Sequence, residues 1–472
     1  MLNLKAEFES CTLARAFLAG ILIGISPMLI SQENNDVNGD WFGELNVQTM
    51  KLRVAFHVVS NNAGFTGTMA SLDQNITGIP LSKVSISDRD VTLEVARING
   101  DFTGELSDDG SSLVGTWEQR GQKIPLTLRR GNAAESITLT RPQTPQPPFP
   151  YNTEEVLINN PNAKVKLGGT LTLPKGSGPF PVAILITGSG VQDRNESLMG
   201  HQPFLVLSDY LTRYGIATLR TDDRGIGQST GDFQSSSIRD FAGDVEAQLQ
   251  FLKTRPEINH QQMGLIGHSE GGMVASMLAH SNDDVNFIVL MASPGVSGKD
   301  LLIAQSVALA EVQGLGSQQL RMIKDQNSRL LELAVSSRTD EQVYRRLNNR
   351  LSGPALDQVT AQMQQLRSPK AQIVLKYNPA DDFSRTQIPV VAIIGTKDRQ
   401  VPAEQNLPEI RKALENAENP HFEVVALPEL NHLFQTAKTG APSEYRDIEE
   451  TMAPIALEKI TQWITGLYSK NS

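Results

Sequence analysis

The hydrophobic pattern of the first third of the chain has the period of a β-sheet. Between residues 39 and 131, β-branched residues partly alternate with polar ones in the runs LRVAFHVV, KVSISD, VTLEVARI and KIPLTLRR. Turn signals such as Asp109-Gly110 separate these runs. Short alternating runs between turn signals are typical of meandering antiparallel strands. We therefore expect a small all-β domain over residues 39–131, either a barrel or a sandwich.

From residue 151 onward, continuous apolar runs replace the alternation. They read PVAILIT, GIATLR, MGLIG, FIVLMA, PVVAIIG and FEVVALP. Runs of this kind indicate strands that are buried on both faces, as in a parallel sheet. Helical stretches lie between several of them, for example residues 238–254, where Val245, Leu249 and Leu252 fall on one face. The alternation of strands and helices predicts a doubly wound α/β domain over residues 151–472.

Two segments depart from these patterns. Residues 299–378 have helical periodicity and no convincing strand. A stretch of that length is too long for a loop in a compact domain, so we interpret it as an inserted helical cap. Residues 132–150 end in RPQTPQPPFP, a composition that favours an extended course and predicts a semi-rigid linker.

The N-terminus carries one apolar run, AFLAGILIGISPMLI, at residues 16–30. It is short for a membrane span, which needs about 20 residues, and fits the apolar core of a signal peptide. We expect residues 1–31 to be a signal peptide and the protein to be exported to the periplasm or the extracellular space. Membrane anchoring by residues 16–30 is the alternative. No other stretch is long and apolar enough to span a bilayer, so we expect a soluble mature chain.

Composition excludes several classes of function. Among 472 residues, 42 are basic and 52 acidic, and the resulting net charge of −10 disfavours nucleic-acid binding, which needs a basic surface. Cys11 is the only cysteine. The chain therefore cannot form an internal disulfide or a metal site built from several cysteines. We expect neither a metal nor an organic cofactor.

The motif GHSEGG at residues 267–272 points to nucleophilic catalysis. It follows the expected strand MGLIG and precedes a helix-like stretch, so Ser269 would occupy a sharp strand-to-helix turn. Such a turn crowds the positions two residues before and after the serine, and only small residues such as Gly267 and Gly271 fit there. The sequence therefore predicts that Ser269 is a nucleophile. An idle serine in a glycine-rich connector is the alternative.

A serine hydroxyl needs a base, and the base needs an orienting acid. His432 follows the last expected strand, where its loop would lie above the serine, whereas His268 beside the serine should point away. Asp398 follows the strand PVVAIIG, and Glu429 is its nearest rival. The order Ser269, Asp398, His432 is the order of the triad in α/β-hydrolases.

The developing oxyanion needs backbone donors. The segment Gly188-Ser189-Gly190 follows the strand PVAILIT, and small residues there would let the backbone approach a substrate. We expect the N–H groups of Ser189 and Glu270 to form the oxyanion hole, with Gly190 as the fallback to Ser189. The segment TDDRGIGQSTG, after the next strand, is interpreted as structural, since its charged residues can hold the turn beside the serine.

With these motifs in place, residues 151–472 resemble bacterial α/β-hydrolase esterases of the serine aminopeptidase and prolyl-oligopeptidase-like branch. The resemblance rests on LITGSGVQDRNES, TLRTDDRGIGQSTG, GLIGHSEGGMVA, KYNPADDF, PVVAIIGTKDRQVPAEQN and NHLFQTAKTGAPSEY, which occur in the expected order. It implies that Ser269 is the nucleophile, His432 the general base and Asp398 its orienting acid. Residues 39–131 resemble an accessory domain found in some of these esterases.

The expected function is hydrolysis of small-molecule carboxylic esters through an acyl-enzyme. An aminopeptidase or acyl-peptide hydrolase would use the same triad. It would need a carboxylate for the substrate amine or a propeller domain, and residues 39–131 are too few for a propeller. A ligand-binding protein with a vestigial hydrolase is a third reading. The sequence leaves open the acyl and alcohol groups of the substrate and the oligomeric state.

Overall fold

The computed structural model describes residues 37–47, 50–61, 64–74, 76–119, 121–131, 140–349 and 352–469. The expected signal segment, with Cys11 and the apolar run, lies outside these residues, as do residues 132–139 of the expected linker. Among the described residues, no helix combines the length and the apolar character needed to cross a membrane.

The N-terminal region is a nine-stranded antiparallel sheet, which confirms the all-β expectation. In spatial order its strands are β4 (Ile76–Pro80), β3 (Gly64–Ser71), β2 (Met50–Asn61), β1 (Gly39–Val47), β9 (Gln122–Arg130), β8 (Ser112–Gln119), β7 (Gly100–Leu106), β6 (Asp90–Val95) and β5 (Lys83–Ser87).

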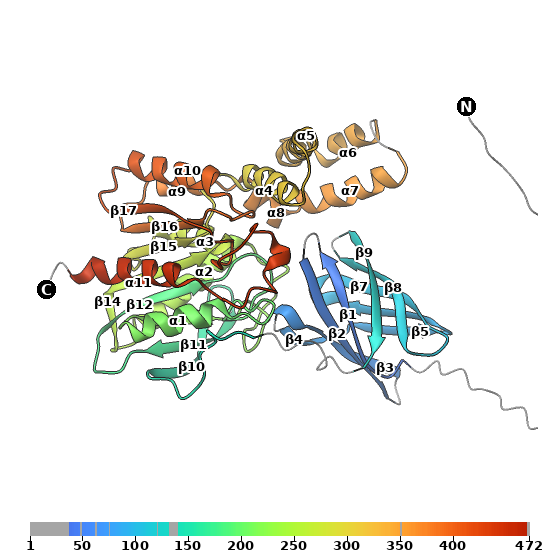
Figure 1. The fold of residues 1–472 in the computed structure, drawn as a ribbon, viewed down its shortest axis with the longest axis horizontal. Helices are drawn as coiled ribbons and strands as arrows, with labels where there is room; N and C mark the ends of the chain where they lie inside the picture. The colour runs from blue at the N-terminus through green and yellow to red at the C-terminus, as the bar shows by residue number, and fades with distance from the viewer. Residues whose placement is uncertain are drawn as a thin grey trace, which may run out of the picture. The chain divides into compact units, whose positions relative to one another are not determined.

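This sheet encloses its own hydrophobic core because its apolar residues alternate. On β6, for example, Val91, Leu93 and Val95 are fully buried while the residues between them are more exposed. The core contains Trp41 and Trp117, both at most 1% exposed. Between β4 and β5, the N–H of Leu81 donates to Gly67 of β3 at 3.0 Å and the N–H of Ser82 donates to Glu94 of β6 at 2.8 Å. The connection between the two edge strands therefore bridges the ends of the sheet, which curls as Figure 1 shows.

The C-terminal region is built on an eight-stranded sheet. In spatial order its strands are β10 (Asn152–Asn160), β11 (Val165–Leu173), β13 (Ala217–Thr221), β12 (Phe180–Ile186), β14 (Ile258–His268), β15 (Phe287–Met291), β16 (Val390–Gly395) and β17 (Phe422–Leu427), as Figure 1 shows. The six strands β12 to β17 pair in parallel with their neighbours among these six, and they correspond to the six apolar runs in the sequence. The first two, β10 and β11, are antiparallel additions that the apolar runs do not indicate.

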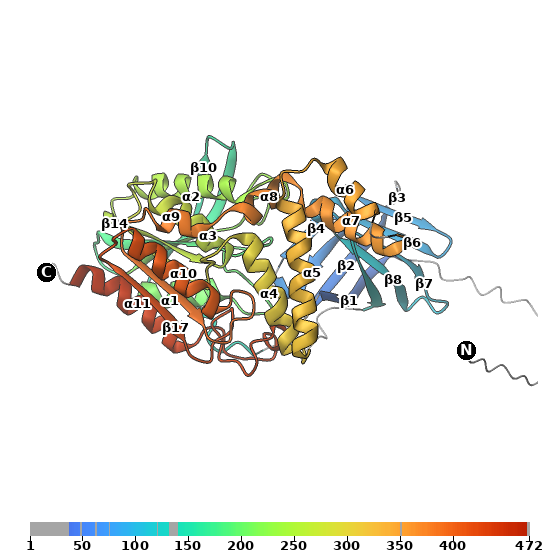
Figure 2. The same cartoon turned by 90° about the horizontal axis from the view of Figure 1, so that it is seen from above.

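Helices cover both faces of this sheet, so each face has a separate core (Figures 1 and 2). One face packs against α1 (Pro203–Arg213) and α11 (Pro454–Ser469). The other packs against α2 (Ile238–Leu252), α3 (Glu270–Ala279), α9 (Pro379–Phe383) and α10 (Ala403–Asn416). Such a doubly covered parallel sheet is the α/β-hydrolase arrangement, and the expected fold class is confirmed.

Five helices follow β15 in place of a short connection. They are α4 (Gly298–Val312), α5 (Ser317–Val335), α6 (Asp340–Asn348), α7 (Pro354–Leu366) and α8 (Pro369–Lys376), and we call them the cap. Four buried side chains of α5, α6 and α7 form a small core of their own: Ala334, Val343, Leu347 and Met363. The two ends of the cap meet, because the N–H of Gly298 donates to the carbonyl of Tyr377 at 3.2 Å.

The described part of the Pro-rich segment is bound to the α/β domain by side chains. The Arg141 guanidinium donates to the carbonyls of Met199 and Arg446, both at 2.7 Å. The Gln143 amide donates to the Met452 carbonyl at 2.7 Å. Residues 140–149 are therefore attached along the α/β domain at specific points. In addition, Arg446 of the α/β domain forms an ion pair of 2.6 Å with Asp73 of the β-domain.

Candidate active site

Ser269 lies between β14 and α3, at the sharp turn that the GHSEGG motif predicts. Its backbone has φ 53° and ψ −118°, a region that non-glycine residues rarely adopt. The turn is fixed on both sides. The N–H of Ser269 donates to the Met291 carbonyl of β15 at 2.8 Å, and its own carbonyl accepts from the N–H of Gly272 at 3.0 Å. Backbone strain held by the surrounding structure is typical of a nucleophile at such a turn.

The two glycines of the motif are required by close backbone contacts. A Cβ added at Gly267 would lie 2.4 Å from the carbonyl oxygen of Gly271. A Cβ added at Gly271 would lie 2.2 Å from the carbonyl oxygen of Ile186, at the end of β12. Both distances are far below van der Waals contact. The spacing of the motif is therefore a packing requirement, and it places the serine beside the end of β12.

Asp398 and His432 lie within hydrogen-bond distance of each other. The His432 Nδ1–H donates to Asp398 Oδ2 at 2.8 Å, and both residues are at most 5% exposed. The other Asp398 oxygen accepts the N–H groups of Gln400 and Val401, both at 2.8 Å. The carboxylate is thus fully engaged. With its proton on Nδ1, the ring of His432 offers the lone pair of Nε2 to another group.

The loops that carry this pair follow β16 and β17, and a glycine brings them together. A Cβ at Gly395 would lie 2.1 Å from the carbonyl oxygen of Leu430. The side chain of Asn431 accepts the N–H groups of Leu433 and Gln435 at 3.0 and 2.9 Å, which fixes the turn around His432. The rival acid Glu429 is ion-paired with Lys397 and is 65% exposed at its side chain.

The segment expected to supply an oxyanion donor follows β12. A Cβ at Gly188 would lie 3.3 Å from Ser269 Cβ, so this segment runs directly past the serine. The N–H of Gly188 donates to Glu196 Oε1 at 2.7 Å and is therefore committed. Ser189 and Gly190 remain as the candidates of this segment, and Gly190 has φ 97°, a value that favours glycine. Glu270 begins α3, where the N–H groups of the first turn point out of the helix end.

Two further carboxyl groups hold this segment, and the sequence alone did not reveal their roles. Asp223 accepts the Thr187 hydroxyl at 3.0 Å and the N–H of Gln192 at 2.9 Å. Burial, together with the neighbouring carboxylates Glu196 and Glu270, raises the pKa of Asp223 to about 8. The carboxylate of Glu196 also accepts a hydrogen bond from the His268 ring at 2.8 Å. The sequence could have indicated Asp223 and Glu196 as functional candidates, because both lie in loops that follow parallel strands, where functional groups gather.

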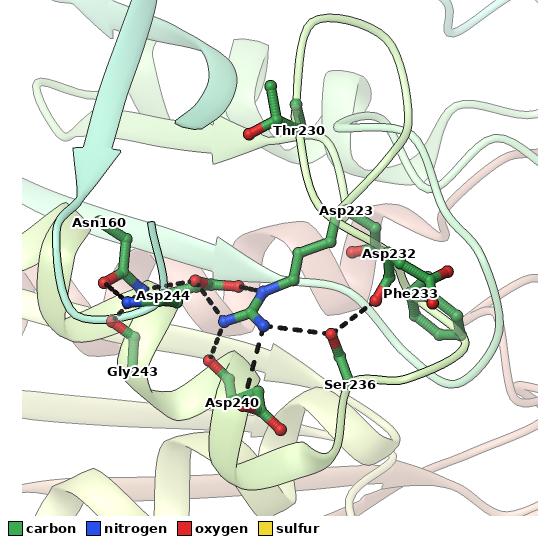
Figure 3. Close-up of polar contacts among 12 residues, drawn as sticks. Asn160, Asp223, Thr230, Asp232, Phe233, Ser236, Asp240, Gly243 and Asp244 are labelled. Carbon is green, nitrogen blue, oxygen red and sulfur yellow. Dashed lines mark hydrogen bonds and ion pairs between the residues drawn. The ribbon is translucent and has the colours of Figure 1, made fainter. Parts of the chain in front are cut away.

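The residues beside Asp223 are bound into the scaffold by ion pairs. The Arg224 guanidinium donates to both oxygens of Asp244 at 2.7 and 2.9 Å. Figure 3 shows Asp244 together with Asp240 and Ser236 of the α2 region. Asp222 likewise pairs with Arg194 at 2.7 Å. Charge-assisted pairs of this geometry fix the loop after β13, as the structural interpretation of TDDRGIGQSTG expects.

Within the described part of the chain, no group of three or more His, Cys, Asp or Glu side chains is arranged to hold a metal ion. The residues around Ser269 are committed to one another by hydrogen bonds. What the arrangement offers chemically is a hydroxyl on a strained turn, a buried histidine–carboxylate pair, and backbone N–H groups near the hydroxyl.

Parts of this chain are similar to known proteins. Residues 202–436 match the family model described as serine aminopeptidase, S33. Esterase EstD of Thermotoga maritima is 24% identical over 310 residues, which cover 63% of this chain and 64% of EstD. The match therefore spans slightly less than two thirds of that relative.

Solved structures with a similar fold include two esterases. The Pyrococcus furiosus esterase Pf2001 is 16% identical, with 71% of this chain and 99% of that chain covered and a TM-score of 0.40. Est1E from Butyrivibrio proteoclasticus, with ferulic acid bound, is 16% identical, with coverages of 67% and 98% and a TM-score of 0.38. This chain therefore carries a domain of the α/β-hydrolase fold behind an all-β domain, and residues 202–436 of that domain are similar to the serine aminopeptidase (S33) family.

Proposed function

We propose that the protein hydrolyses carboxylic esters of small molecules through an acyl-enzyme on Ser269. The observation that carries the proposal is the meeting of two features at one edge of the sheet. These are the serine on its strained turn after β14 and the buried pair of His432 and Asp398, joined at 2.8 Å, after β17 and β16. The name of the relative EstD, an esterase, supports the choice of ester as substrate class.

In the proposed first half-reaction, Ser269 Oγ attacks the ester carbonyl carbon while its proton passes to His432 Nε2. Asp398 keeps the imidazole oriented and stabilises the imidazolium that forms. The carbonyl oxygen becomes an oxyanion, which accepts the N–H groups of Ser189, or Gly190, and Glu270. The bond to the alcohol oxygen then breaks, and His432 returns the proton to the departing alcohol.

In the second half-reaction, water attacks the acyl-enzyme carbonyl and gives its proton to His432. The bond between the acyl carbon and Ser269 Oγ breaks, the serine recovers the proton from His432, and the carboxylic acid is released. Every proton that moves is held by His432, and no step needs a metal ion or an organic cofactor.

A second candidate is cleavage of aminoacyl or peptidyl amides with the same residues, and the family name favours it. Such an enzyme needs a carboxylate for the substrate amine. Two carboxyl groups that hold the segment after β12 are already bonded: Glu196 accepts from Gly188 and His268, and Asp223 accepts from Thr187 and Gln192. Their engagement supports esters over aminoacyl substrates.

The test is a rate comparison between chromogenic esters of increasing acyl length and aminoacyl or peptidyl anilides. We expect turnover of esters and little turnover of anilides. A fluorophosphonate should label one peptide, the one containing GHSEGG, and Ser269→Ala should lose both the label and at least about 10⁴-fold in kcat with its fold intact. A Ser269→Ala variant that keeps a tenth of the wild-type rate would overturn the proposal, and faster cleavage of anilides than of esters would favour the second candidate.

A further inference from the structure

A second histidine–carboxylate pair lies behind Ser269, outside the proposed triad. It consists of His268, the last residue of β14, and Glu196, in the segment after β12. Their side chains are each 6% exposed, and the distance from His268 Nδ1 to Glu196 Oε1 is 2.8 Å. The motif GHSEGG contains this histidine, yet the proposed reaction uses only the serine next to it.

The contacts of the His268 ring determine its protonation state. Its Nδ1 faces the Glu196 carboxylate, and its Nε2 faces the carbonyl oxygen of His432 at 3.0 Å. Both partners are acceptors, so each ring nitrogen must carry a proton to make its bond. A neutral ring would direct a lone pair at a carbonyl or a carboxylate inside the protein, which is costly. Beside an ionised Glu196, this hydrogen-bond geometry favours an imidazolium.

The charges around the ring favour the same state. Burial opposes a charged ring, but the adjacent Glu196 carboxylate raises the pKa of His268 above its ordinary value, and Asp398 acts in the same direction. The other titratable group that faces it is His432, whose ring centroid lies 4.8 Å away. Asp223 also interacts with Glu196, and burial raises the pKa of the Asp223 carboxyl to about 8.

The same pair connects two parts of the candidate site that are far apart in sequence. The Glu196 oxygen that accepts from His268 also accepts the N–H of Gly188, the residue before Ser189. On the other side, the ring holds the main chain of His432 itself. A continuous chain of hydrogen bonds thus runs from the oxyanion segment through Glu196 and His268 to the general base, passing directly behind Ser269.

We propose that His268 and Glu196 are positioning residues, and that a permanently charged His268 imidazolium ties the oxyanion segment to the backbone of the general base. The role in catalysis rests on the proposed function, whereas the charge on His268 does not. A displacement of about 1 Å in a reacting group can cost about 10²-fold in rate. Loss of this connection should therefore lower kcat and leave substrate binding nearly unchanged.

The charge is tested without any activity measurement. In the full-length protein labelled with ¹⁵N-histidine, long-range ¹H–¹⁵N spectra at pH 8 should show one ring with both nitrogens protonated. Its signals should vanish in His268→Asn. Glu196→Gln should leave that ring with one unprotonated nitrogen at the same pH. A wild-type His268 ring with an unprotonated nitrogen at pH 8 would overturn the proposal, whatever the enzyme does.

The positioning role is tested by Glu196→Gln, which keeps the shape of the side chain and removes its charge. We expect kcat on a small ester to fall by about 10²-fold with KM nearly constant. The alkaline limit of the rate should also move to lower pH, because the unsupported imidazolium loses its proton sooner. The matched control is His280→Asn. His280 caps the other end of α3 and faces its own carboxylate, Asp382, at 3.4 Å. The kcat and the pH profile of His280→Asn should be the same as those of the wild-type protein.

Equal losses of kcat in Glu196→Gln and His280→Asn, or an unchanged pH limit in Glu196→Gln, would show a merely structural pair and overturn the positioning role. Failure of the proposed function is recognised separately. In that case Ser269→Ala would retain the wild-type rate, while the protonated His268 ring would still be seen in the spectra.

Discussion

The two sheets of this protein have similar numbers of strands but differ in how their faces are covered. The nine antiparallel strands of the β-domain surround one core, and their alternating pattern leaves the other face to the solvent. The parallel strands of the α/β domain are covered on both faces, so their loops are the only places where functional groups can gather. Ser269, Asp398, His432 and Glu196 all lie in or beside loops that follow such strands, and none lies in β1–β9.

The comparison indicates that the antiparallel sheet contributes a stable core, whereas the loops of the parallel sheet carry the candidate catalytic residues. In the β-domain, buried side chains such as Trp41 and Trp117 pack in the hydrophobic core. The α/β domain buries charged groups beside its serine and satisfies them with one another. The predictions below test that division, beginning with the largest expected effect.

The largest effect should come from Asp398, the proposed orienting acid. Asp398→Asn keeps the size of the side chain but gives His432 Nδ1 a partner that favours the wrong tautomer. We expect kcat on a small ester to fall by about 10⁴-fold. The control is Glu429→Gln, because this exposed rival follows the neighbouring strand and pairs only with Lys397 among the contacts described here. A larger loss in the control than in Asp398→Asn would mean that the acid has been assigned wrongly.

The next largest effect concerns stability and uses one phenylalanine from each sheet. Phe56 on β2 and Phe287 on β15 are both at most 1% exposed, so each truncation to alanine should cost about 3–5 kcal/mol. The third tryptophan, Trp463, packs against Phe287, so both variants are made in a Trp463→Phe background. Heating can then be followed by the fluorescence of Trp41 and Trp117 and by residual ester hydrolysis.

We expect Phe56→Ala to lower the temperature of the fluorescence change and to leave the temperature of activity loss nearly constant. Phe287→Ala should do the reverse. A common shift of both signals in both variants would show that the two sheets unfold as one unit, and the comparison would then fail.

A smaller effect is expected when the β-domain is removed. A chain of residues 140–472 keeps the bonds of Arg141 and Gln143 to the α/β domain, whereas a chain beginning at residue 150 loses them. We expect both chains to hydrolyse a small ester at nearly the wild-type rate and the longer one to melt at a higher temperature. Removal also exposes Ile226, which packs into the β-domain core, so both should be less stable than the full chain. A folded chain 140–472 without activity would show that the β-domain helps to build the site.

The last prediction concerns the pH dependence of stability and involves no change in the rate. With a pKa of about 8 in the fold and about 4 when unfolded, Asp223 holds a proton in the native state that the unfolded chain releases. The free energy of unfolding should therefore fall as pH rises from about 4 to about 8. In Asp223→Asn this decline should be shallower, as measured by urea unfolding at pH 5 and pH 8.5. An equally steep decline would show that Asp223 is ionised in the folded protein.

The sequence predicted those parts of the molecule that are encoded locally. The six apolar runs correspond to β12–β17. The GHSEGG motif marks a sharp turn in which Gly267 lies against Gly271, although the contact of Gly271 with Ile186 of β12 also contributes to its spacing. The strands β10 and β11 were missed because their polar alternation, as in NTEEVLINN, lacks a continuous apolar run. In the β-domain, runs such as GFTGTMAS and GDFTGEL contain glycines and few branched residues, so β3 and β7 gave no clear pattern.

The parts that could not be predicted depend on contacts between distant residues. Glu196 and His268 are 72 positions apart, and nothing in either neighbourhood indicates the other. The same holds for Arg141, whose bonds to residues 446 and 448 turn an expected linker into an attached segment. No local pattern specifies such pairs, because they arise only once the loops after separate strands have been brought together.

The meeting of the two ends of the cap has a consequence for how this protein can change over time. Gly298 and Tyr377 are hydrogen-bonded, and a Cβ at Gly298 would lie 2.2 Å from the Val374 carbonyl, so the insertion leaves and re-enters the scaffold at almost one point. Because the two ends of the cap lie side by side, the cap can be lengthened, exchanged or shortened at little cost in loop-closure entropy. With its own small core, the cap could be grafted between related scaffolds as a unit. Recombination at residues 298 and 377 is thus a natural route by which such chains could diversify while the sheet beneath stays the same.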